Sequence, residues 1–171
     1  MTSETDCPSH KLGLCQLLDC SKCYALKAER QYPAVLPYRK RQADSWENDT
    51  ATSIYNDIVK AIGNKAIKFI RFNESGDFTD QKCIIKLKAI ARKLLKSHPD
   101  IRVYGYSARK DLSFANMPSN LAINGSNWSR GNMNCFRAVE AYTGDNPQCP
   151  GNCRSCHLCK SAKNLTIEVL M

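Results

Sequence analysis

The placement of its ten cysteines limits what this 171-residue chain can fold into more than any other feature. Eight of them form two groups, one near each end: Cys7, Cys15, Cys20 and Cys23, then Cys149, Cys153, Cys156 and Cys159. The opening sequence MTSETDCPSH lacks the basic and then apolar order of a secretory signal, so we expect a cytoplasmic protein. Disulfides are rare in that reducing compartment. The cysteines therefore predict thiolate-bound metal rather than a disulfide framework.

The spacing within each group indicates which metal to expect. The C-terminal group reads C-x3-C-x2-C-x2-C, and successive two-residue gaps are typical of iron–sulfur sites. Zinc more often uses two separated cysteine pairs, so a structural zinc site is the alternative. In the N-terminal group, Cys20 and Cys23 form a C-x2-C pair, and Cys15 is close enough to join them. We expect a [4Fe–4S] cluster, and the eight cysteines could form either one shared site or two. Cys7 and Cys149 are the ligands that the spacing supports least.

Hydrophobic periodicity between the two groups predicts an α/β core over residues 50–142. An amphipathic pattern predicts helices over 50–63 and 79–97, the second capped by Asp77 or Thr79. Short β-branched and aromatic runs predict five strands, over 66–72, 101–106, 121–126, 135–142 and 165–171. Because the strand over 66–72, the helix over 79–97 and the strand over 101–106 follow one another within about forty residues, these two strands should be parallel.

These elements predict one domain over residues 1–171, with a small parallel or mixed sheet and partial helical cover. Its cysteine-rich metal-binding segments would span 1–25 and 149–160. Cys83 lies on the apolar stripe of the second helix and Cys135 opens a strand, so both are expected to be core thiols.

Polar residues gather where the predicted strands end, which is where ligands bind in parallel α/β sheets. The candidate ligand-binding residues are Glu74, Ser75, Gly76, Asp77, Tyr104, Arg109, Asn124 and Ser126. A plainer interpretation treats Ser75-Gly76-Asp77 as a helix cap and turn, because turns and binding sites use the same residue types.

The formal charge of +9 makes an anionic partner plausible, nucleic acid first, and a host protein is the other possible partner. The same cations could instead balance a negatively charged cluster. No stretch approaches the roughly 20 apolar residues that a membrane span requires, so no membrane partner is expected.

The order of four motifs resembles the gene product 88 family of phages and plasmids. The motifs are CSKCYA (20–25), FNESGDF (72–78), VYGYSARK (103–110) and CRSCHLC (153–159), so the resemblance covers nearly the whole chain. It implies a protein of a mobile element and brings no particular activity.

A wider resemblance is to radical S-adenosylmethionine (AdoMet) enzymes. Cys15-x4-Cys20-x2-Cys23 followed by Tyr24 is similar to their cluster motif, although the first gap there is three residues. Ser75-Gly76-Asp77 stands where those enzymes carry a Gly-Gly-Glu stretch that binds AdoMet. The resemblance implies a truncated half-barrel of strand–helix units, with one cluster iron free to bind AdoMet.

Three functions stay open, and only one of them makes the chain an enzyme. The first is an iron–sulfur protein with a structural, redox or regulatory cluster. The second is a reduced radical-AdoMet-like enzyme acting on a nucleotide or nucleic acid. The third is a zinc-bound module that binds nucleic acid or a host protein.

Overall fold

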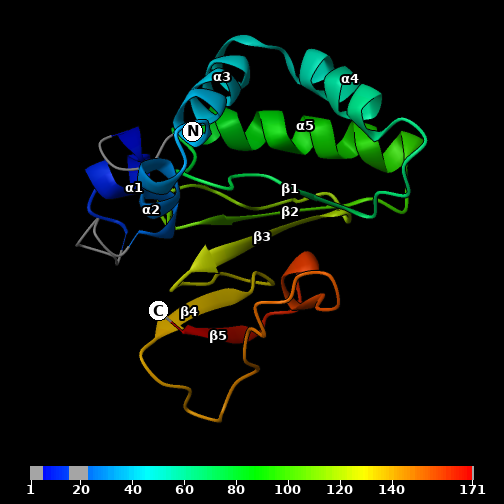
Figure 1. Cartoon of the computed structure of the whole chain (residues 1–171). Coiled ribbons are helices and arrows are strands. Elements are labelled where there is room, and N and C mark those ends of the chain that lie inside the picture. Colours follow the sequence, from blue (N-terminus) through cyan, green and yellow to red (C-terminus); the bar gives the residue numbers. More distant parts are fainter. Residues whose placement is uncertain (1–5, 16–22, 171) are drawn as a thin grey trace.

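A single parallel sheet forms the centre of the protein in the computed structural model, which describes residues 6–15 and 23–170. The five strands lie side by side in chain order, each parallel to the next. They are β1 (Phe69–Arg71), β2 (Arg102–Ser107), β3 (Leu121–Ser126), β4 (Cys135–Val139) and β5 (Thr166–Leu170). The predicted α/β class and all five strands are confirmed, and the sheet is parallel rather than mixed. Figure 1 shows the order from β1 to β5.

Helices precede the sheet in the chain and connect its first two strands. They are α1 (Pro8–Lys11), α2 (Tyr24–Gln31), α3 (Val35–Asn48), α4 (Ala51–Ile62) and α5 (Gln81–Ser97), and a 3₁₀ turn, η3 (Leu158–Lys160), precedes β5. The N-cap of α4 is Thr50, whose side chain accepts a hydrogen bond from the Ser53 amide. The predicted cap of α5 is wrong, because Asp80 accepts the Cys83 amide while Asp77 is engaged elsewhere.

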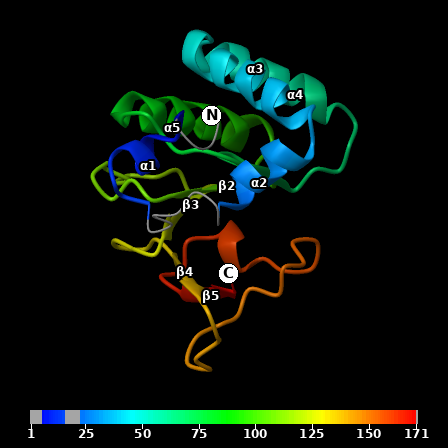
Figure 2. The ribbon, with the colours of Figure 1, turned by 60° about the vertical axis from the view of Figure 1, so that its left-hand side comes forward.

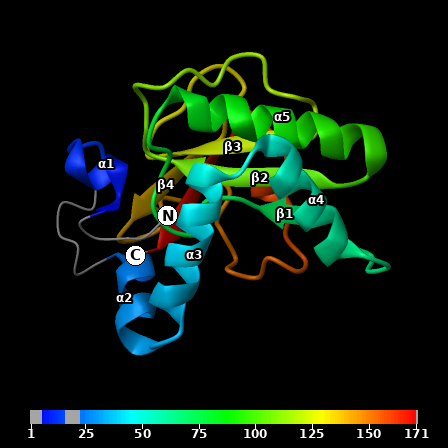
Figure 3. The same ribbon diagram turned by 90° about the horizontal axis from the view of Figure 1, so that it is seen from above.

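The main core lies between α5 and one face of the sheet. The apolar stripe of α5, including Ile84, Leu87 and Ile90, is fully buried against Val103 and neighbouring strand residues. Seen from above, α3 and α4 lie along the helical side of the sheet with α5 (Figure 3). Cys83 and Cys135 are both buried, which confirms them as core thiols.

The opposite face of the sheet is covered by the C-terminal segment instead of by α-helices. Tyr104 and Ala122 form a smaller apolar cluster there with Cys159, which belongs to η3. Figures 1 and 2 show α5 and η3 on opposite sides of the sheet. Residues 108–120, 127–134 and 140–165 connect the later strands without an α-helix, so the helical cover is partial, as predicted. No helix among the described residues is long and apolar enough to cross a membrane.

Gly125 near the end of β3 allows the chain to turn back tightly on itself. A Cβ atom at this position would lie 1.9 Å from the Trp128 carbonyl oxygen, far inside van der Waals contact. That turn also places Trp128 to donate a hydrogen bond of 2.9 Å to the Ser107 carbonyl at the end of β2.

We therefore expect Gly125→Ala to destabilise the protein by about 2–3 kcal/mol, because the backbone must shift to relieve the overlap. Urea denaturation measures this loss. Gly105→Ala is the matched control, because its Cβ would meet its nearest atom, the Phe72 carbonyl oxygen, at 3.0 Å. An equal loss in both variants would contradict the argument.

Candidate functional site

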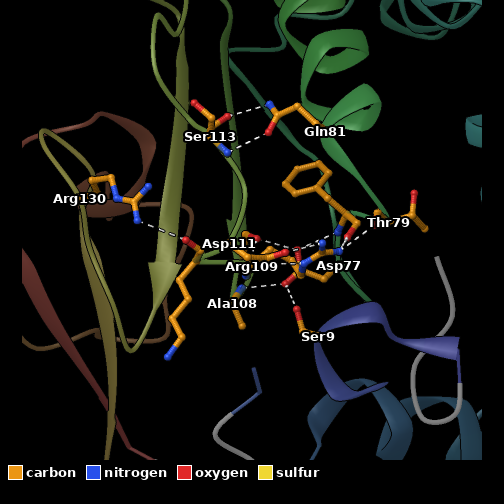
Figure 4. Close-up of polar contacts among 12 residues, drawn as sticks. Ser9, Asp77, Thr79, Gln81, Ala108, Arg109, Asp111, Ser113 and Arg130 are labelled. Atoms are coloured by element: carbon orange, nitrogen blue, oxygen red, sulfur yellow. Dashed lines mark hydrogen bonds and ion pairs between the residues drawn. The ribbon is translucent and has the colours of Figure 1, made fainter. Parts of the chain in front are cut away.

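Asp77 joins the N-terminal segment to the carboxyl ends of the first two strands. It is 3% exposed, and four described donors bind its carboxylate. They are the Ser9 hydroxyl (2.5 Å), the Ser107 hydroxyl (2.7 Å), the Ala108 amide (2.7 Å) and the Phe78 amide (2.8 Å). Burial raises the pKa of Asp77, and the four donated hydrogen bonds oppose that shift. Figure 4 shows Ser9 of α1 pointing into this cluster.

Arg109 lies beside Asp77 and is committed to internal partners. Its Nε and Nη2 atoms form two hydrogen bonds with Asp111, of 2.9 and 2.8 Å. Its Nη1 atom donates to the carbonyl oxygens of Phe78 and Thr79. The Asp111 hydrogen bond is the main cause that raises the pKa of Arg109, and the charge of Asp77 acts in the same direction. Arg109 therefore has a structural role beside Asp77, because its guanidinium group is already bound to Asp111 and to two backbone carbonyl oxygens.

A second buried arginine, Arg39, fixes the part of the chain that follows the N-terminal cysteines. Arg39 of α3 is 4% exposed and donates through Nη1 to the Ala25 carbonyl (2.8 Å) and to Glu29 (2.9 Å) of α2. Its Nε and Nη2 atoms bind Glu74 in the loop after β1. The loop of residues 73–77 thus holds α1 through Asp77, and α2 and α3 through Glu74.

The described cysteines of the N-terminal group, Cys7, Cys15 and Cys23, lie near this carboxyl edge of the sheet. Burial is the main cause that raises the pKa of Cys7, and nearby charge on Asp77 and Cys15 acts in the same direction. Cys23 is the N-cap residue of α2. Cys20 lies outside the described residues. Cys7 and Cys15 are therefore neighbours, and Cys23 leads into the helix that Arg39 fixes.

Cys159 lies on the face of the sheet opposite α5, whereas Cys149 lies at the outer edge of β5, next to Gln148, which pairs with Glu168. Burial raises the pKa of Cys159, and charge on Cys153 adds to that shift, while a hydrogen bond with Tyr106 opposes it. The backbone amide of Cys149 donates a hydrogen bond to the Glu168 carbonyl of β5. Cys153 is exposed. Cys156 is half-buried.

The structure does not bring the described cysteines of the two groups together. Cys7 and Cys15 lie near Asp77 at the carboxyl edge of the sheet, whereas Cys159 packs on the face opposite α5. In Figure 1, α1 lies beyond one end of the sheet, and η3 lies below the sheet. Within residues 6–15 and 23–170, no three His, Cys, Asp or Glu side chains are arranged to hold a metal ion.

The candidate ligand-binding residues divide between these two regions. Asn124 is fully buried, and it donates to the carbonyl oxygens of Gly105 (3.0 Å) and Cys159 (2.9 Å). Tyr104 packs beside Cys159, and Ser126 pairs with Phe136 of β4. The others lie at the carboxyl edge: Glu74, Ser75, Gly76, Asp77 and Arg109. Gly76 has a φ of 67°, a left-handed conformation that suits glycine in the turn of that loop.

Sequence reasoning missed several residues that organise both regions. No local pattern marks Ser9, and the basic run Arg39-Lys40-Arg41 is typical of a solvated face, although Arg39 itself is buried. Asn134 is fully buried and fixes the segment before β5. Its side-chain Nδ2 donates a hydrogen bond to the Ser161 carbonyl, and its Oδ1 accepts hydrogen bonds from the amides of Lys163 and Leu165. An asparagine just before a strand was the only available signal.

Together these features define a parallel α/β protein with a cysteine-bearing segment docked at the carboxyl edge of its sheet. The family model described as gene product 88 matches residues 1–146, and the chain belongs to that family. The C-terminal cysteine group lies beyond the matched residues. No curated protein and no solved structure matches the chain, so these comparisons lend no support to the resemblance to radical AdoMet enzymes.

Proposed function

We propose that this protein binds a [4Fe–4S] cluster through its N-terminal cysteines at the carboxyl edge of the sheet. One observation carries the proposal: the chain on both sides of those cysteines is fixed to the same 73–77 loop. Ser9 binds Asp77 before Cys15, and Arg39 links Glu74 to the helix that begins after Cys23. These two contacts with one short loop, the first of them to the buried carboxylate of Asp77, hold the described flanks of the cysteine segment near the edge where parallel sheets bind their ligands.

The residues present fit a cluster in their chemistry. Cys15, Cys20 and Cys23 are the proposed ligands, and Cys7 is the neighbour of Cys15 that could complete the site. A bound cluster would supply one-electron transfer. Because thiolates are the ligands and burial raises the pKa of Cys7, loading would release protons.

The C-terminal cysteines are proposed as a second metal site. Cys153, Cys156 and Cys159, with Cys149, lie on another part of the sheet, so two sites fit the arrangement better than one shared cluster. Tyr106 contacts Cys159, and such a contact with a ligand sulfur tunes a metal centre. Zinc is the alternative metal here.

An AdoMet-dependent enzyme is the second candidate function. The sequential order of five parallel strands resembles that of a half-barrel, and the described cysteines Cys7 and Cys15 lie near Asp77, at the carboxyl edge of the sheet. Against it, the carboxylate of Asp77 is already occupied by Ser9 and Ser107, although the amino group of AdoMet needs an acceptor at this place.

Anaerobic purification with iron and sulfide analysis tests the proposal. We expect a brown protein absorbing near 400 nm, and loss of about half of the iron in each of Cys20→Ala and Cys156→Ala. Cys135→Ala is the matched control, because that buried core thiol should leave the iron content unchanged.

The other outcomes separate the alternatives. Loss of all iron in both variants would mean one shared cluster. A colourless protein with stoichiometric zinc would contradict the iron–sulfur proposal and favour the zinc-bound module. Cleavage of AdoMet by the reduced protein would establish the second candidate function.

A further inference from the structure

Helix α5 carries positive charge that no acidic residue of the helix balances. Its 17 residues include six basic side chains and no acidic one: Lys82, Lys86, Lys88, Arg92, Lys93 and Lys96. Within the described chain, none of these six forms an ion pair. One tenth of the residues therefore carries a net charge of +6, compared with +9 for the whole chain.

The arrangement of these charges disfavours the helix itself. Side chains four residues apart on a helix are neighbours, so like charges at that spacing repel each other. Three such pairs occur: Lys82 and Lys86, Lys88 and Arg92, and Arg92 and Lys96. Burial lowers the pKa of Lys88, and the charge of Arg92 acts in the same direction. Lys82 also lies in the first turn, where the helix dipole favours negative charge. The stability of α5 therefore gives no reason for these cations.

Contacts with neighbouring elements account for three of the six cations. Lys86 donates to backbone carbonyl oxygens at the end of α3, and Lys88 donates to a carbonyl of the β2–β3 loop. Lys93 lies 5.6 Å from the centre of an aromatic ring of α4, the helix beside α5 in Figure 3. The other three cations are exposed: Lys82, Arg92 and Lys96.

These three exposed cations lie on one side of the helix. Steps of three and four residues join them to Ile85 and Ala89, which places all five opposite the buried apolar stripe. We call these five residues the outer stripe of α5. From Lys82 to Lys96 it extends over about 20 Å, at a rise of 1.5 Å per residue. A straight row of cations of this length matches a rigid, regularly charged partner.

The residues of the outer stripe distinguish among anionic partners. Single-stranded nucleic acids bind largely by stacking bases on aromatic side chains, and α5 has none. A helix that binds a membrane surface inserts its apolar face, but the apolar stripe of α5 is fully buried in the core. Protein interfaces are depleted in lysine at their centre, and Ile85 is the one large apolar side chain of the stripe. A duplex, with its dense and regular phosphates, fits best.

We infer that the outer stripe of α5 binds the phosphate backbone of a double-stranded nucleic acid. Lys82, Arg92 and Lys96 each pair with a phosphate oxygen. Phosphate contacts position a protein without reading bases, so little preference for sequence is expected. The surface is independent of the proposed metal sites. Because α5 starts at the carboxyl edge and runs back to the start of β2, Arg92 and Lys96 lie away from the N-terminal cysteines.

Fluorescence anisotropy of the full chain with a labelled DNA duplex tests the inference. We expect log Kobs to fall with log [salt] with a slope of about −3, because each neutralised phosphate contributes about −0.9. The triple variant Lys82→Gln, Arg92→Gln, Lys96→Gln should bind at least about tenfold more weakly at low salt and lose most of that slope. Its urea midpoint should equal or exceed that of the parent protein, because like-charge pairs are removed.

Lys27→Gln, Lys40→Gln, Arg41→Gln is the matched control. It also removes two exposed lysines and one exposed arginine, from α2 and α3, and likewise lowers the formal charge from +9 to +6. Because only the overall field changes, its affinity should stay within about threefold of the parent protein. Equal weakening by the two triple variants would overturn the assignment to α5.

Other probes identify the partner. Failure of the duplex to bind below about 100 μM at low salt would overturn the inference. So would tighter binding of a single strand of the same sequence, of poly-L-glutamate as an acidic polypeptide, or of phosphatidylserine vesicles. A duplex of RNA in place of DNA shows which nucleic acid is preferred, and preference for either duplex supports the surface.

Discussion

Asp77→Ala is expected to destabilise the protein by about 4 kcal/mol, more than the loss of any other polar anchor at this edge of the sheet. The four donors that Asp77 accepts would lose their partner, and two of them are hydroxyl groups of buried serines, Ser9 and Ser107. A buried donor without an acceptor costs about 1–3 kcal/mol, and entering water offsets part of the sum. Urea denaturation followed by circular dichroism measures the change.

Two further variants sharpen this prediction. Asp57→Ala is the matched control, because Asp57 is exposed on α4 and should change stability by less than about 0.5 kcal/mol. Ser9→Ala removes one hydrogen bond and should cost about 1 kcal/mol. It should also speed proteolysis within the first fifteen residues, because α1 loses its anchor. A loss below about 1 kcal/mol in Asp77→Ala would show that water replaces its hydrogen bonds.

Arg39→Met should cost about 3 kcal/mol, the second largest effect expected at this edge. The substitution keeps the apolar stem but leaves the buried carboxylate of Glu29 without its cation, since the Glu29 side chain is only 6% exposed. It also removes the donor to the Ala25 carbonyl. Glu74 suffers less, because its side chain is 59% exposed and water can solvate it. Urea denaturation again measures the loss.

A double variant tests the cause of that loss. Arg39→Met with Glu29→Gln also removes the buried negative charge that has lost Arg39, and it should recover a substantial part of the stability. Arg41→Met, on the exposed side of the same helix, is the control and should be nearly neutral. If the double variant is no more stable than Arg39→Met alone, packing rather than charge is the reason for the effect.

The two substitutions also bear on the proposed cluster. Both release the N-terminal cysteine segment from the 73–77 loop, one before Cys15 and the other after Cys23. Each should therefore lower the iron content more than Gly125→Ala does, although Gly125→Ala is also destabilising. An iron content that simply follows stability across the three variants would argue against a positioning role for the loop.

Most of the secondary structure could be predicted from the sequence, because it depends on neighbouring residues. The apolar stripe from Ile84 to Leu94 predicts α5, and the predicted strand over 121–126 is the one observed. Strand ends were less predictable. The run over 66–72 forms only the three-residue β1, because just Phe69–Arg71 pairs with β2 in the ladder.

The candidate site could be predicted only in part. The 73–77 loop was identified from its polar residues, but as a ligand-binding rim. In the structure its carboxylates hold Ser9 and Arg39, which are 68 and 35 residues away in the chain. Even the cap of α5 moved to Asp80 because Asp77 is drawn into this long-range cluster. No local pattern reports such partners.

The sequence by itself determined the two cysteine groups, the α/β class, the five strands and the core thiols Cys83 and Cys135. All of these follow from residue type, spacing and periodicity. Only the tertiary structure decided that the described cysteines of the two groups lie apart and that one loop holds the first group on both sides. These depend on strand order and on which connections lack a helix, and both emerge only when distant segments pack together.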